Sequence, residues 1–352
     1  MVGRSATSSA AGAAVRRLGA AGCLAAATAL LVAGCSSSGG GSGSGGSGSS
    51  TPSTFSAALS DIPSTSWDGS YFEFGDADAV TQLNNASSGK SALYAYTMVG
   101  ESTLMEADQG DLGFNPLTVS SAVTVGDAPP RQTTVLYGSF NPSTIGTKLS
   151  GLGFKQDGSA DGGTLWVITA AKSGENNPTN DPELNVLDVS ADRIVLGDST
   201  ADVEAIAAAG THSLGSNATL AALANCLGSA KAGLIGSYPP GQAQSSTYVG
   251  IGLLASSADD ASEELCVTAS SSAKAASIEA NWKQRIEHGT TVTLDEPWSK
   301  LFTDPQATTV GSAPIVVRLT AQRAPGARVG ALLTDYENPY VDFSNLIDQS
   351  AS

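Results

Sequence analysis

The chain has 352 residues, of which 41% are hydrophobic and 14% charged, so it is long enough to bury one large core or two ordinary ones. Acidic residues outnumber basic ones by 33 to 17, which gives a formal net charge of −16. Such a surface repels polyanions, and binding of nucleic acid is therefore not expected.

The first 34 residues have the features of an export signal. Arg4, Arg16 and Arg17 precede or border an apolar stretch over residues 18–33, and no acidic residue occurs among them. This stretch is shorter than the roughly 20 residues that a membrane-spanning helix needs. We interpret residues 1–34 as a secretory signal that is removed. The alternatives are an uncleaved transmembrane helix, or a signal peptide that ends near a cysteine by chance.

The run Leu31-Val32-Ala33-Gly34-Cys35 resembles the lipobox of bacterial lipoproteins. In that family, small residues before the cysteine allow cleavage, and the cysteine becomes the N-terminus that carries diacylglycerol. The resemblance implies that Cys35 is lipidated and anchors the protein at the outer face of the cell membrane. The abundance of Ala, Gly, Ser and Asp also resembles that of secreted lipoproteins of GC-rich actinobacteria. Neither resemblance implies an activity.

A linker follows the cysteine. Residues 36–50 contain only glycine and serine, and such a segment is a flexible coil with a span of about 20 Å. Removal of the signal leaves 14 basic and 33 acidic residues, a formal charge of −19. Because this charge disfavours direct binding to anionic headgroups, we expect the lipid on Cys35 to be the membrane contact.

The first half of the globular part mixes strand and helix patterns. Strands are predicted over residues 70–74, 117–125, 132–140, 164–168, 184–189 and 193–197. Helices are predicted over residues 76–83, 145–152 and 200–209, the second of them after an N-terminal cap at Asn141.

The second half contains a similar mixture. Strands are predicted over residues 231–238, 247–255, 263–269 and 315–320, and helices over residues 217–229, 271–288 and 327–335. Residues 289–314, which include Pro297 and Pro305, are predicted to be irregular.

The strands come in hairpin groups and do not alternate regularly with helices. This order predicts an α+β fold with mixed or largely antiparallel sheets and helices packed on one face. A strand, a proline and a helix occur in the same order at residues 132–152 and 315–335, which suggests two similar α+β units as a hypothesis. We divide the mature chain into an anchor and linker (35–52), an N-terminal unit (53–210) and a C-terminal unit (211–352).

Cys226 and Cys266 form an even pair once Cys35 is acylated. Outside the cell such a pair can oxidise, so we predict a disulfide between them. The alternative is two buried thiols that never pair.

No motif specifies a reaction, a cofactor or a metal. His212 and Ser213 adjoin in a glycine-bounded turn, but the spacing and the preceding helix do not fit a nucleophile elbow. Ser87 and Lys90 have a Ser-x-x-Lys spacing without its companion motifs. His212 and His288 are the only histidines, which makes a zinc site improbable. Neither a catalytic nor a metal-binding residue is therefore predicted.

Acidic groups at residues 157–161, at Asp259-Asp260 and at Glu263-Glu264 could offer oxygen ligands to calcium. They lack the spacing of a calcium-binding loop, and we interpret them as solvated turns.

The four tryptophans divide into two kinds. Trp166 and Trp282 lie in apolar elements and are expected in the core. Trp67 and Trp298 lie in irregular segments, where a tryptophan can line a binding surface, so they are the first candidates for one.

Three functions remain open on the sequence. The first is a non-catalytic envelope lipoprotein that binds a protein partner or supports a cell-surface assembly. The second is a small-molecule or lipid carrier, or the solute-binding component of a transporter, which requires a deep cleft. The third is an envelope hydrolase with carboxylates as acid and base.

Overall fold

A computed structural model describes residues 51–66, 70–86, 93–97, 99–100, 112–115, 118–126, 132–160, 162–168, 184–207, 212–240, 245–257, 259–291, 295–337 and 342–347. Cys35 and the linker lie outside these residues, as do Trp67, Ser87 and Lys90.

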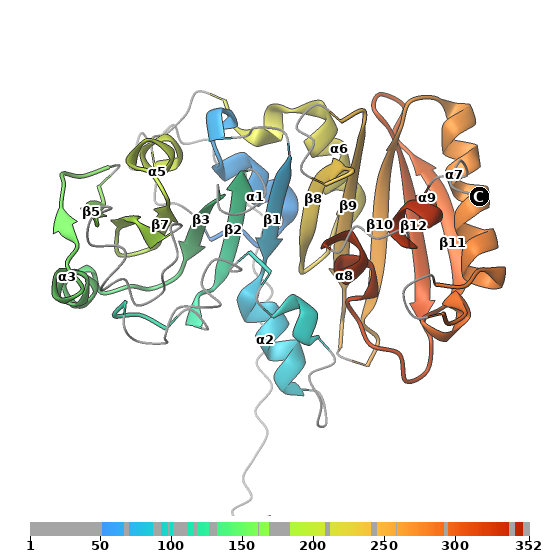
Figure 1. Cartoon of the computed structure of the whole chain (residues 1–352), viewed down its shortest axis with the longest axis horizontal. Coiled ribbons are helices and arrows are strands. Elements are labelled where there is room, and N and C mark those ends of the chain that lie inside the picture. Colours follow the sequence, from blue (N-terminus) through green and yellow to red (C-terminus); the bar gives the residue numbers. More distant parts are fainter. Residues whose placement is uncertain are drawn as a thin grey trace, which may run out of the picture. The chain divides into compact units, whose positions relative to one another are not determined.

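Within the described residues, one antiparallel sheet of twelve strands runs through the protein (Figure 1). From one edge to the other its order is β11 (Phe302–Val310), β12 (Ile315–Arg323), β10 (Ser262–Ala269), β9 (Thr247–Leu254), β8 (Ala232–Tyr238), β1 (Tyr71–Gly75), β2 (Ser121–Gly126), β3 (Gln132–Tyr137), β7 (Arg193–Gly197), β6 (Val186–Val189), β5 (Thr164–Val167) and β4 (Lys155–Gln156). The α+β class with an antiparallel sheet is confirmed.

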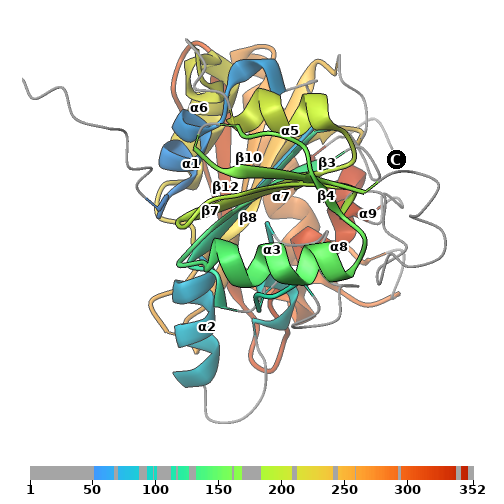
Figure 2. The same cartoon turned by 90° about the vertical axis from the view of Figure 1, so that its left-hand side faces the viewer.

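Helices lie against both faces of this sheet, and not against one face as expected (Figure 2). One face carries α1 (Phe55–Asp61), α5 (Thr200–Ala207) and α6 (Ala218–Leu227), and the other carries α2 (Ala77–Ala86), α3 (Pro142–Gly151), α7 (Ser272–His288), α8 (Ala331–Glu337) and α9 (Asp342–Ile347).

Consecutive apolar residues in the strands explain the two covered faces. In β8, Leu234 packs with the cluster around α7, whereas its neighbour Ile235 packs with the cluster around α1 and α6. Successive side chains of a strand point to opposite faces, so an uninterrupted apolar run requires a cover on both.

The strands of the two halves occupy separate halves of the sheet and share an order. A helix, three neighbouring strands, a second helix and a returning hairpin follow one another as α1-β1-β2-β3-α3-β6-β7 and as α6-β8-β9-β10-α7-β11-β12, with α2, β4 and β5 additional in the first half. The returning strand pairs with the third strand in both halves, β7 with β3 and β12 with β10.

This topology aligns the two halves differently from the sequence echo. The echo matched residues 132–152 with residues 315–335, that is, β3 and α3 with β12 and α8. In the shared strand order, β3 and α3 instead correspond to β10 and α7. Residues 48–352 form one compact unit, and the boundary between residues 210 and 211 stays a prediction.

Local sequence signals start α3 and α6 close to where they were expected, whereas the helix predicted over residues 327–335 begins at Ala331. Asn141 accepts a hydrogen bond from the Thr144 amide at 3.1 Å, and Pro142 occupies the first turn of α3. The Asn217 side chain accepts from the Thr219 amide at 2.9 Å at the start of α6. These caps determine the residue at which each of the two helices begins.

A disulfide joins Cys226 of α6 to Cys266 of β10, as the sequence predicts. Both residues are buried, and they lie 40 positions apart in the chain. The bond fastens α6 to the centre of the C-terminal half of the sheet.

Replacing both cysteines with serine should lower the free energy of unfolding by about 4 kcal/mol, because the unfolded chain then loses a closed loop of this length. Urea unfolding of the double variant and of the oxidised protein measures the difference. A matched variant, Ser216→Ala in the exposed turn before α6, should unfold nearly like the parent protein, because it loses only the exposed hydrogen bond to the Ser213 carbonyl. Equal stability of the double variant and the parent would show that the bond contributes nothing.

Candidate binding site

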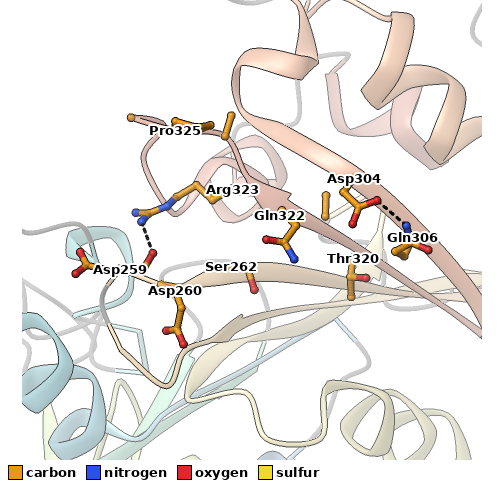
Figure 3. A pocket seen from close by; sticks show the side chains of 13 residues that line it. Asp259, Asp260, Ser262, Asp304, Gln306, Thr320, Gln322, Arg323 and Pro325 are labelled. Carbon is orange, nitrogen blue, oxygen red and sulfur yellow. Dashed lines mark hydrogen bonds between the residues drawn. The ribbon is translucent and has the colours of Figure 1, made fainter.

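A polar pocket of about 400 Å³ lies at one end of β10, β12 and β11 (Figure 3). Asp259, Asp260 and Ser262 line it from the turn before β10 and from the start of that strand. Its other polar side chains come from the two outermost strands and are Asp304, Gln306, Thr320, Gln322 and Arg323. The pocket therefore combines three carboxylates with one guanidinium.

Hydrogen bonds hold several of these groups in place. Arg323 Nη2 donates to the carbonyl oxygen of Asp259 at 2.9 Å, and Gln306 Nε2 donates to Asp304 Oδ1 at 2.9 Å. Figure 3 shows the first contact joining the end of β12 to the turn before β10 and the second lying along β11. The remaining polar atoms of such exposed side chains are available to a ligand or to water.

Asp260 remains ionised at neutral pH. Its carboxylate accepts hydrogen bonds from the Ser256 hydroxyl and from the Ser257 amide, which lower its pKa to about 2. The turn that holds it thus presents a permanent negative charge.

The backbone of β11 is irregular beside the pocket. Asp304 has a φ of 50°, and the pairing with β12 shifts in register between Thr303 and Gln306. Pro305 lies inside this bulge and cannot donate a backbone hydrogen bond. The bulge separates the pocket-lining Asp304 from the regular part of the strand.

A buried carboxylate lies next to the pocket on the same face of the sheet. Glu264 is opposite Thr320 in the pairing of β10 with β12, and it is only 2% exposed. Its Oε2 atom lies 3.5 Å from Nε of Arg318. Its Oε1 atom has no hydrogen-bond partner among the described residues. Burial raises the pKa of Glu264 to about 7, and the charge of Arg318 opposes that rise.

Arg318 also links this carboxylate to the disulfide region. Its Nη2 atom donates to the carbonyl oxygen of Cys226 at the last turn of α6. A guanidinium there stabilises the negative end of the helix dipole. The Glu264–Arg318 pair is thus part of the contact between α6 and the sheet.

The expectation of a solvated turn at Glu263-Glu264 is wrong, because both residues are buried in β10. Glu263 accepts hydrogen bonds from Tyr96 Oη at 2.8 Å and from the amides of Ala331 and Leu332 at 3.0 and 3.2 Å. It therefore fixes the first turn of α8 and has a structural role. Asp259 and Asp260 are exposed in the turn, as expected.

Trp298 is not a surface residue. It is 1% exposed and stacks on Phe302, with the ring centroids 6.1 Å apart. Trp282 is fully buried, as expected, whereas Trp166 is half-buried against Gly146 of α3. Trp298, which the sequence places in an irregular segment, is therefore part of the core.

Neither of the two histidines lines the polar pocket. His212 is exposed, and Ser213 forms an isolated β-bridge with Pro63. His288 is exposed at the end of α7, 3.6 Å from the neighbouring Glu287. Among the side chains that the structure describes, no group of three His, Cys, Asp or Glu residues could hold a metal ion.

Comparisons with other proteins add no relative: no family model matches the chain, and neither the curated proteins nor the solved structures gave a match. None of the helices in the described ranges has the length and hydrophobicity needed to cross a membrane.

Glu264→Gln should flatten the pH dependence of stability. The folded-state pKa of Glu264 is raised to about 7 from an ordinary value of 4.5, so its contribution is fully present below pH 4.5 and is lost as the pH rises through 7. The parent protein should lose up to about 3 kcal/mol of unfolding free energy over this interval from this group.

Urea unfolding at pH 4.5, 6 and 8 measures this slope in the parent, in Glu264→Gln and in the exposed control Glu287→Gln. We expect the Glu264 variant to be more stable than the parent at pH 8. Parallel pH curves for all three proteins would contradict the assignment.

Proposed function

We propose that the protein is a non-catalytic, lipid-anchored envelope protein whose extracytoplasmic α+β domain binds a protein partner. The open polar pocket at the outer end of the sheet carries this proposal. It displays charged and amide groups from β11, β12 and the turn before β10, and such groups form the solvent-accessible rim of protein interfaces. Its lining includes neither a histidine nor a cysteine, and its carboxylates are those of Asp259, Asp260 and Asp304.

The carrier alternative has less support. A solute-binding component should offer two lobes around a deep cleft, whereas here a single sheet continues through both halves of the chain. The pocket at its end is polar and opens to solvent.

The hydrolase alternative has one favourable observation, which is that the pKa of Glu264 is raised whereas Asp260, in the turn before the same strand, is ionised. However, the pocket lining does not include Glu264, and Arg318 occupies one of its oxygens. We therefore assign Glu264 to the contact between α6 and the sheet.

The membrane anchor is tested by Cys35→Ala. We expect at least a tenfold rise in the fraction of protein released from membranes, because the acyl chains are lost. Immunoblots of membrane and soluble fractions measure it. Cys23→Ala, which changes a cysteine inside the signal, is the matched control and should stay membrane-bound. Unchanged membrane association of the Cys35 variant would rule out the anchor.

The partner is tested by placing a photo-reactive amino acid at Gln322, an exposed residue on the rim of the pocket. Irradiation of whole cells should give a discrete cross-linked product of higher mass in the membrane fraction. The same group at Glu204, exposed on α5 in the other half of the chain, should give at least fivefold less. Equal yields at both positions, or none, would count against a partner at this end of the sheet.

A further inference from the structure

The two edges of the sheet are protected to very different degrees. β4 has only two residues, both exposed, and one of them is Lys155. A short edge strand with a lysine is a common protection against pairing with another chain. β11 at the other edge has nine residues, and its stretch from Gln306 to Val310 contains no charge. We therefore call the β4 edge closed, because it is short and carries a lysine, and the β11 edge open.

β11 is the edge strand, and a further strand would have to pair along its outer side. Among the described residues it pairs only with β12, so its outward backbone N–H and C=O groups face no other strand. Its one face is covered by α7, where Thr309 Oγ1 donates to Glu279 Oε1 at 2.8 Å. On the other face Gln306 and Thr308 are exposed. The bulge at Asp304 and Pro305 interrupts only the beginning of the strand.

We propose that an extended, basic segment of a protein partner adds to β11 as a further strand of the sheet. This inference rests on the proposed function and names the surface and the chemistry of its partner. Strand addition supplies affinity through main-chain hydrogen bonds, and side-chain pockets supply specificity. The polar pocket has the required position, because Asp304 and Gln306 belong both to its lining and to β11.

Charge selects a basic segment over a second copy of this chain. The pocket next to the edge holds three carboxylates and one guanidinium. The whole chain has a formal charge of −16. Lys or Arg side chains of an added strand complement this surface, whereas a second copy would bring another acidic surface against it.

The probe is a pair of nine-residue peptides with alternating Val and Thr that differ only in carrying two Lys or two Glu at the same positions. We expect the Lys peptide to bind at least tenfold more tightly than the Glu peptide in isothermal titration at low salt. Hydrogen exchange should show amides of residues 306–310 slowed at least tenfold by the Lys peptide. Protection elsewhere, or equal binding of both peptides, would overturn the proposal.

Thr308→Lys places a charge on the open edge and should weaken the Lys peptide at least tenfold. Gln156→Lys at the closed edge is the matched control and should bind like the parent. Thermal melting checks that both variants fold. Unchanged binding to Thr308→Lys, or a dimer of the parent protein in sedimentation that Thr308→Lys abolishes, would refute the basic-strand occupant.

These outcomes are separable from the partner proposal itself. A cross-link at Gln322 that persists in the Thr308→Lys protein would mean that a partner binds, but not by strand addition. Absence of a cross-link at Gln322 in the parent protein would instead count against any partner at this end of the sheet.

Discussion

The antiparallel pairing of β1 with β8 is the interaction on which the rest of the structure depends. Five residue pairs, from Tyr71 with Gly236 to Gly75 with Ala232, join strands of the two halves in the middle of the sheet.

Both faces of this pairing are buried. Phe72 and Phe74 of β1 face α1 and α6, and the ring of Phe55 in α1 contacts that of Phe74 edge to face, with the centroids 5.2 Å apart. On the opposite face the buried Glu73 accepts a hydrogen bond from the Gly100 amide at 3.1 Å. Because both faces of this pairing are buried, the two halves cannot separate without exposing apolar surface and a carboxylate.

The central pairing of β1 with β8 also determines which edges of the sheet are exposed. Since β1 and β8 bury each other's edges, the exposed edges are left at the two far ends, β4 and β11. The N-terminal half ends in a strand of two residues, while the C-terminal half ends in a long strand next to a polar pocket. The halves share a strand order but differ at their outer ends, and the half that carries the open edge also holds the disulfide between α6 and β10.

The sequence predicts most regular elements of this fold, but it misses β11 at the edge and the short elements α1, α9 and β4. The unit of β3, the Asn141 cap and α3 could be predicted because a β-branched run, a cap and a turn agree locally. β11 could not, because Pro305 and the positive φ of Asp304 interrupt its pattern, and only the pairing with β12 makes it a strand. The burial of Glu263 likewise depends on Tyr96 and on α8, which are distant in sequence. Long-range pairing, and not local propensity, creates the site.

An open edge and a membrane anchor suit one another physically. An edge strand with an uncharged stretch such as residues 306–310 invites pairing with any extended chain, which is a liability for a freely diffusing protein. Under the proposed attachment at Cys35, a Gly/Ser linker with a span of about 20 Å keeps the edge near the membrane surface. A tether of this length raises the effective concentration for partners in the same membrane and leaves it low for others. The acidic surface adds a second selection, because it repels like-charged chains before their backbones can meet the edge. Tether and charge together would make the edge selective without a deep recognition pocket.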